Sequence, residues 1–265
     1  VQLTGVAQYV AELCNVSMPA HHRYTGSSAF AHKGGLHASA IARFPAAYEH
    51  VSPAAVGNTS RTVVSELAGK ASLLAKARSL GFDLEAAGVD VQAVLDDIKA
   101  REAAGFTYEV ADGSLGLLLM RHLRLYAPAF TLESFRVIVD DREDTGALAK
   151  DALSEATVKI HVGEGRFVAT GESAGPVGAL DAALRMAIVA SYPQVEAMEL
   201  IDYKVRLLDE SQGTDAITRV TITATDGVDT WGTVGVSENV IEASWNALVD
   251  SLEYGLFRAR VRAGK

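Results

Sequence analysis

The sequence predicts an α+β protein in which a small, mostly helical region, residues 1–128, is followed by a duplicated βββα domain, residues 129–265. Two observations support this prediction. Up to Pro128, apolar residues recur at helical spacing, whereas beyond it they alternate with polar residues, as in half-buried strands. In addition, the second part of the chain repeats its own pattern at a fixed offset, and 265 residues are enough for two domains with cores.

Charge and composition exclude several classes of protein. With 33 Asp and Glu against 24 Lys and Arg, the net charge is −9, which repels nucleic acid and anionic lipid surfaces. No apolar run approaches the ~20 residues that cross a bilayer, and no secretion signal opens the chain. We therefore expect a cytoplasmic protein without nucleic-acid or membrane partners. The single cysteine, Cys14, excludes an intrachain disulfide, and its apolar neighbours favour a core position.

The first region is expected to contain four helices. Their boundaries are indicated by capping Thr or Asp residues and by closing glycines. The expected helices are residues 4–14 with Thr4 as the cap, 72–80 closed by Gly81, 90–104 capped by Asp90 and closed by Gly105, and 112–122 capped by Asp112.

The second region begins with a strand and then duplicates itself. Beyond residue 128, Phe135, Val137 and Val139 alternate with Arg136 and Asp140, as expected for a strand. At an offset of 64 residues, the pairs are Val158 and Ile222, Gly163 and Gly227, Phe167 and Trp231, Gly171 and Gly235, Ser173 and Ser237, Ala179 and Ala243, Ala183 and Ala247, and Leu184 and Leu248. Each copy therefore predicts three strands and a helix.

Turn signals place the hairpins and helices of the two copies. Gly163 to Gly165 and the pair Asp226–Gly227 predict tight hairpins, and helices are expected at about residues 176–191 and 239–255. Two such units form a cleft between them, which suits a small ligand. The same duplication also suits a pure dimerisation scaffold, so the pattern alone leaves both functions open.

Two polar segments could carry chemistry. Ser27 to His37 contains two histidines around Gly34–Gly35, and His37 is a candidate general acid or base. The alternative is that both histidines are hydrogen-bonded loop residues without a catalytic role. The segment has no carboxylate or cysteine at zinc-ligand spacing. Gly171 to Gly178 leads into a helix start, where free amides attract an anion such as a carboxylate, or it forms a plain turn.

Long segments of the chain resemble one enzyme family. SSAFAHKGGLHASAI (27–41), YEHVSPAAVGN (48–58) and SELAGKASL (65–73) are similar to the linker of the isopropylmalate synthase family. TWGTVGVSENVIEASWNALVDSLEY (230–254) resembles the regulatory domain of its citramalate synthase branch, and GESAGPVGALDAAL (171–184) resembles the start of the first regulatory helix.

The resemblance implies an acyltransferase that condenses acetyl-CoA with pyruvate to citramalate. In this family a TIM barrel of ~250 residues upstream holds a divalent metal and most substrate ligands. This sequence contains no such barrel and no metal ligands of its own, so we expect the chain by itself to be inactive. The first residue, Val1, hints at a fragment.

The resemblance also implies site residues and partners. His37 and Tyr48 match the linker residues that reach the active site of the neighbouring subunit in a homodimer, with His37 assisting proton transfer and Tyr48 contacting substrate. Ala38 to Ala40 replace the Gln-Asp-Gly that is common in isopropylmalate synthases, which weakens that alternative.

The implied effector is isoleucine, bound in the terminal domain. The residues that match its site are Gly175, Pro176 and Val177 in the first copy, and Asp202, Tyr203, Ser237 and Asn239 in the second. The alternatives are the same region of a leucine-inhibited isopropylmalate synthase, and a non-enzymatic amino-acid-binding or dimerisation module. The linker His-Tyr element favours the enzyme, because a separate sensor has no use for it.

Overall fold

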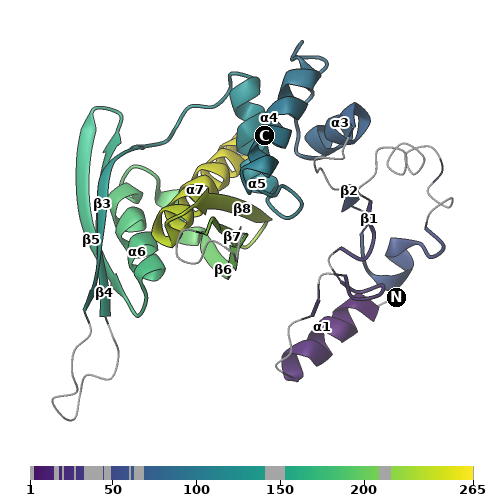
Figure 1. Cartoon of the computed structure of the whole chain (residues 1–265), viewed down its shortest axis with the longest axis horizontal. Coiled ribbons are helices and arrows are strands. Elements are labelled where there is room, and N and C mark those ends of the chain that lie inside the picture. The colour runs from purple at the N-terminus through teal and green to yellow at the C-terminus, as the bar shows by residue number, and fades with distance from the viewer. Residues whose placement is uncertain are drawn as a thin grey trace. The chain divides into compact units, whose positions relative to one another are not determined.

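The computed structural model describes residues 3–14, 18–19, 21–26, 28–32, 44, 49–59, 61–62, 69–140, 153–208 and 216–264. The chain forms two compact units, Val1–Glu102 and Ala103–Lys265, which are described separately (Figure 1). The second unit begins before residue 128, because it includes a helix that the sequence assigns to the first region. The functional division at residue 128 stays a prediction.

The first unit consists of helices and one very short pair of strands. Its elements are α1 (Leu3–Leu13), β1 (Ala31–His32), the 3-10 helix η2 (Pro53–Val56), β2 (Arg61–Thr62), α3 (Lys70–Ser79) and α4 (Val91–Ala103), which ends at the boundary of the unit. Strand β1 pairs in parallel with β2. The predicted cap of α4 is confirmed, since the Asp90 carboxylate accepts the backbone N–H of Gln92 at 2.9 Å. Leu73, Leu84 and Ile98 are buried.

Two expectations for the first helix are wrong. Thr4 lies inside α1 rather than capping it, and its hydroxyl donates to the carbonyl of Val56 at 2.7 Å. Cys14 is exposed rather than part of a core. The first error arises because α1 begins at Leu3, before Thr4, and the second because the apolar side chains near Cys14 are exposed.

The second unit contains the two predicted βββα copies, preceded by α5 (Asp112–His122). The first copy consists of β3 (Thr131–Asp140), β4 (Leu153–Val162), β5 (Gly165–Ser173) and α6 (Pro176–Ile188); the second consists of β6 (Glu199–Leu207), β7 (Thr218–Thr225), β8 (Thr230–Ser237) and α7 (Val240–Ala263). A 3-10 helix, η3 (Pro193–Ala197), connects them. Both sheets are antiparallel and ordered as in the sequence, which confirms the predicted α+β duplication.

Glycines at equivalent positions of the two copies are needed for the same structural reasons. Gly163 and Gly227 adopt φ of 57° and 79° in the two hairpin turns, a region that glycine enters freely. Gly171 and Gly235 lie where each third strand meets its helix, and a Cβ at either position would collide with the helix backbone. The helices can therefore lie close to their sheets.

The helices α6 and α7 lie between the two sheets (Figure 1). Each covers its own sheet with Ala and Leu residues such as Ala183, Leu184, Ala247 and Leu248, all buried. The copies also touch directly, because the ring of Trp245 on α7 stacks on Phe135 of β3 with centroids 5.1 Å apart. Both apolar faces are thereby removed from water in one core.

Two features distinguish the second copy. Helix α7 has 24 residues against 13 in α6, and its last turns carry Arg258 and Arg262, which pair with Asp229 and Asp226 of the β7–β8 turn. In addition, α5 packs on α7 and β8. The Ser114 hydroxyl of α5 donates to Asp250 of α7 at 2.6 Å and accepts the backbone N–H of Val234 in β8 at 3.0 Å. This helix start was expected at Asp112, but the N-cap residue is Ala111.

Candidate functional site

The predicted catalytic residues, His37 and Tyr48, lie outside the described residues. The structure does describe the segments next to them. The Tyr24 hydroxyl lies 3.3 Å from Nε2 of His50, two residues after Tyr48, and the Asn58 side chain donates to the carbonyls of Tyr24 and Gly26 at 2.9 and 3.0 Å. These contacts bring residues 24–26 together with residues 50–58.

The first predicted effector element forms the start of α6. Gly175 is its N-cap residue in extended conformation, and Pro176 occupies the first turn, where its missing N–H costs nothing. No described side chain caps this helix start. Gly178 packs closely against the Ser173 hydroxyl, since a Cβ there would lie 2.5 Å from Oγ. The amides of the first turn and the positive end of the helix dipole are therefore directed at the space in front of Gly175.

The second predicted effector element forms the start of α7 and is organised differently. Oδ1 of Asn239 accepts the backbone N–H groups of Ile241 and Glu242 at 2.8 and 3.4 Å. The Ser237 hydroxyl accepts the N–H of Asn239 at 3.1 Å and donates to the Glu242 carboxylate at 2.9 Å. Asn239 thus caps α7, and Ser237 bonds both the cap residue and Glu242, so polar atoms of both residues that a ligand would otherwise use are already occupied.

Asp202 and Tyr203 are neighbours on β6 and have different partners. The Tyr203 hydroxyl lies 2.8 Å from the hydroxyl of Ser244, which donates to the Val240 carbonyl at 2.6 Å, so Tyr203 joins the group at the start of α7. The Asp202 carboxylate is 44% exposed and pairs with Lys204 on the same strand. The structure therefore gathers Tyr203, Ser237 and Asn239 at one helix start and Gly175 to Val177 at another.

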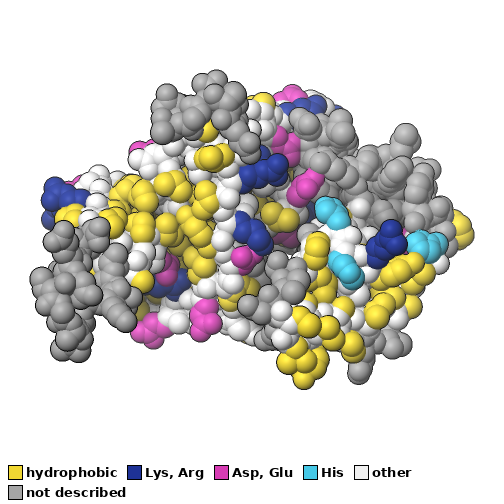
Figure 2. Space-filling model, turned by 60° about the horizontal axis from the view of Figure 1, so that its bottom comes forward, with side chains coloured by type: hydrophobic (Ala, Val, Ile, Leu, Met, Phe, Trp, Pro, Cys, Tyr) yellow, Lys and Arg dark blue, Asp and Glu magenta, His cyan; other side chains and the backbone are white. Residues whose placement is uncertain are grey.

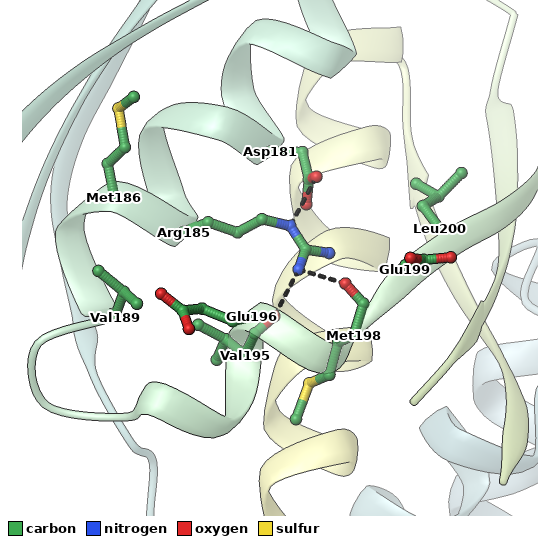
Figure 3. Close-up of a pocket in the computed structure, with 9 residues that line it drawn as sticks. All are labelled: Asp181, Arg185, Met186, Val189, Val195, Glu196, Met198, Glu199 and Leu200. Atoms are coloured by element: carbon green, nitrogen blue, oxygen red, sulfur yellow. Dashed lines mark hydrogen bonds and ion pairs between the residues drawn. The ribbon is translucent and has the colours of Figure 1, made fainter. Parts of the chain in front are cut away.

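A pocket that the sequence did not predict lies at the other end of α6 (Figure 3). Its volume is about 620 Å³, and it is lined by Asp181, Arg185, Met186, Val189, Val195, Glu196, Met198, Glu199 and Leu200. At its centre, Nε of Arg185 donates to Asp181 at 2.7 Å, while Nη1 donates to the carbonyls of Val195 and Met198 at 2.8 and 2.6 Å. Arg185 thereby fastens η3 to α6. The sequence feature that could have pointed to this pocket is the i, i+4 spacing of Asp181 and Arg185. That spacing predicts only an ion pair on a helix surface.

A buried carboxyl lies where α7 meets the segment before β3. Glu253 is 2% exposed, and its carboxylate accepts the backbone N–H of Ala129 at 2.8 Å. Burial raises the pKa of the Glu253 carboxyl to about 7, although bonds from the N–H groups of Ala129 and Phe130 partly oppose that rise. The Tyr192 hydroxyl donates to the carbonyl of Ala129 at 2.9 Å, so Ala129 is held through both its N–H and its carbonyl group.

Metal and membrane features can be stated for the described residues. Among them, no group of three or more His, Cys, Asp or Glu side chains is placed to hold a metal ion. No helix in the described ranges combines the length and apolar character needed to cross a membrane.

The chain matches two protein-family models and a series of curated proteins. Residues 109–256 match the LeuA allosteric (dimerisation) domain, and residues 24–105 match the homocitrate synthase post-HMGL domain-like family. The (R)-citramalate synthase of Streptomyces coelicolor is 47% identical over 98% of this chain and 48% of its own length. Those of Aquifex aeolicus and Sulfolobus acidocaldarius are 44% and 36% identical, over 97% and 96% of this chain and 48% and 46% of their own lengths.

The matches confirm the resemblance of both parts of the chain to one family of proteins. The chain spans about half the length of the curated relatives it matches. The first family model alone covers more than half of the chain, including the first βββα copy and the second as far as residue 256 in α7. The chain therefore belongs to the LeuA allosteric (dimerisation) domain family.

Proposed function

We propose that the chain is the carboxy-terminal, regulatory part of a citramalate synthase, an acyltransferase that condenses acetyl-CoA with pyruvate. The observation that carries this proposal is its identity of 47%, 44% and 42% to three (R)-citramalate synthases over nearly the whole chain. A catalytic barrel elsewhere in the longer polypeptide would hold the divalent metal, which would polarise the keto group of pyruvate. The chain by itself would be inactive.

Within this proposal the region before residue 128 acts as the linker. His37 would assist proton transfer at the methyl group of acetyl-CoA, and Tyr48 would contact substrate, both in the active site of a neighbouring subunit of a homodimer. An imidazole suits this role because its pKa lies near neutral pH. The contacts among Tyr24, His50 and Asn58 would hold the backbone near Tyr48.

The complete protein that the gene encodes tests the catalytic proposal. Release of CoA from acetyl-CoA should depend on pyruvate and on a divalent metal, and should be weaker with 2-ketoisovalerate. His37→Ala should lower kcat by about 10²-fold or more. The matched control is His22→Ala, since the His22 ring lies 2.7 Å from the hydroxyl of the neighbouring Thr25. Preference for 2-ketoisovalerate would transfer the assignment to isopropylmalate synthase.

We further propose that residues 129–265 bind isoleucine as an end-product inhibitor. The start of α6 at Gly175, Pro176 and Val177 would receive the ligand carboxylate, because its amides lack a side-chain cap. Asp202 would receive the ammonium group in exchange for Lys204. Tyr203, Ser237 and Asn239 would form the polar rim at the second helix start.

Calorimetric titration of the chain with isoleucine, leucine and valine tests this effector site. Isoleucine should bind with the highest affinity, and Gly175→Asn should weaken binding by placing a side chain over the amides. Asn at this position is compatible with the extended backbone, and nothing lies within 4 Å of a Cβ there. A folded chain that binds none of the three amino acids would leave only the dimerisation role.

A further inference from the structure

Helix α1 presents its large apolar side chains to solvent. Leu3, Val6, Tyr9, Val10 and Leu13 are 48%, 53%, 62%, 49% and 69% exposed. Their spacing of three and four residues places them along one stripe of the helix, which we call the α1 stripe. Hydrophobic side chains gather where α1 comes to the surface in Figure 2.

The face of α1 that packs on its own unit is made of small residues. Thr4, Ala7 and Ala11 are the less exposed positions, and they follow the same three- and four-residue spacing on another side of the helix. Thr4 is 8% exposed and is fixed by its hydroxyl to the carbonyl of Val56 at 2.7 Å. The helix is thus anchored through its small face, whereas an amphipathic surface helix normally buries its large apolar face.

The side chains of the α1 stripe indicate what kind of surface can bind it. None of its five side chains carries a charge, and only Tyr9 has a polar atom. A nucleic acid or a charged peptide would gain nothing from this surface, whereas an apolar protein surface of matching shape would exclude water from all five side chains.

We infer that the α1 stripe docks on the part of the longer polypeptide that the chain does not contain, and so joins the regulatory half to the catalytic half. This inference rests on the proposed function. The curated relatives have as much chain again outside the matched region. A partner in the same polypeptide meets the stripe at high effective concentration, so a few apolar side chains are enough to hold it. A second copy has another surface available in the dimerisation domain at residues 109–256.

Hydrogen exchange of the complete gene product, followed for the α1 peptide, tests the inference. In the complete protein the α1 amides should exchange about tenfold more slowly, or slower still, than in the 265-residue chain. The double variant Val6→Lys, Leu13→Lys should remove this protection, while the control Gln8→Lys, at an exposed position off the stripe, should keep it. Both variants leave Thr4, Ala7 and Ala11 in place, so the helix keeps its anchor.

Several outcomes would overturn the inference. The first three are equal exchange rates of the α1 amides in both proteins, equal effects of the stripe and control variants on these rates, and a gene that encodes no further chain. The fourth is protection of α1 in the 265-residue chain that grows with its concentration, and the fifth is protection of α1 in that chain at every concentration. The fourth would identify a second copy as the occupant and the fifth another part of this chain. Because exchange is read independently of CoA release, a docked but inactive protein would refute the proposed activity alone, and an active protein with a freely exchanging α1 would refute the docking alone.

Discussion

The two βββα copies share their sequence pattern but not their surroundings. In β8 of the second copy, residues 231–235 are all buried, whereas in β5 of the first copy half-buried and exposed positions alternate from residue 165 to residue 170. The equivalent residues Val234 and Thr170 are buried and exposed. The difference is α5, which packs on β8 and bonds its backbone through Ser114. A duplicated unit can therefore keep its internal packing while one added helix buries the outer face of one of its strands.

The helix starts differ in the same way. Asn239 caps α7 with its side chain, whereas Gly175 gives α6 no such cap. A glycine in place of Asn at this position costs little stability but leaves amide groups for other acceptors. The backbone N–H groups at the start of α7 thus have a side-chain acceptor, whereas those at the start of α6 have none and can bind a ligand.

The largest effect is expected when the second copy receives a residue of the first. Gly232 is the counterpart of Val168, and a Cβ at Gly232 would overlap the carbonyl of Val110 just before α5. Gly232→Val should therefore lower the free energy of unfolding by about 3 kcal/mol or more, since the backbone before α5 must move. Denaturant unfolding measures this. The reverse change, Val168→Gly, should cost only about 1 kcal/mol, because Val168 is 51% exposed; equal losses would contradict the comparison.

The next effect concerns Glu253, whose counterpart in the first copy is Val189. Because burial raises the pKa of Glu253 from 4.5 to about 7, the folded state binds its proton more tightly than the unfolded state. The stability contribution is complete below pH 4.5 and is lost as pH rises towards and through 7. Glu253→Gln keeps an acceptor for the N–H of Ala129 and removes the charge. We expect it to match the original protein at pH 4.5 and to exceed it by about 3 kcal/mol at pH 8.

Thermal or denaturant unfolding of both proteins across that pH range measures the difference. Asp250 and Arg260 also act on Glu253, so the neighbouring carboxylate on α7 is checked with Asp250→Asn. Parallel stability curves for the Glu253→Gln variant and the original protein would show that Glu253 does not titrate in this range.

A third effect concerns the bond between α5 and the second copy. Ser114→Ala removes the donor to Asp250 and leaves the N–H of Val234 without its acceptor, in a buried position. The expected loss is about 2 kcal/mol. The matched control lies on the outer face of the first copy, where the hydroxyls of Thr157 and Thr170 are 3.0 Å apart and exposed. Thr157→Val should change stability by less than about 0.5 kcal/mol, and a larger loss there than at Ser114 would reverse the comparison.

The smallest effect concerns the helix starts. Asn239→Ala should cost about 1 kcal/mol, because the N–H groups of Ile241 and Glu242 lose their acceptor. Gly175→Asn should instead gain a few tenths of a kcal/mol by giving α6 the missing cap. Helix content and unfolding midpoints of the two variants check both signs. A loss of stability from Gly175→Asn would mean that the amides of α6 already have acceptors.

The sequence predicted the duplication well because its causes are local. The hairpin glycines need positive φ, and Gly171 and Gly235 allow a helix to lie against its strand, so both leave a repeated mark. The periodicity of α5 predicts that one face is buried, but it does not predict which element that face packs against. A signal did exist: Gly232 stands where the first copy has Val168, and a glycine inside a strand marks a close backbone approach.

The candidate site was predictable to a lesser degree. Helix starts at Gly175 and Asn239 follow from local sequence, but the pairing of Tyr203 with Ser244 and the position of Arg185 over η3 depend on tertiary packing. The exposure of Cys14 was missed because an apolar stripe predicts burial without saying against which part of the molecule.

The attachment of α5 sets an order of events during synthesis. The first copy is contiguous from β3 to α6, so all of its own strands and its helix have left the ribosome before α7 is made. Ser114 must wait for a partner 136 residues later in the chain, Asp250, before α5 finds its place. Until α7 has emerged, α5 exposes the buried residues Leu115, Leu118 and Leu119. Closing so long a loop is slow, so this helix needs protection from aggregation until α7 reaches it.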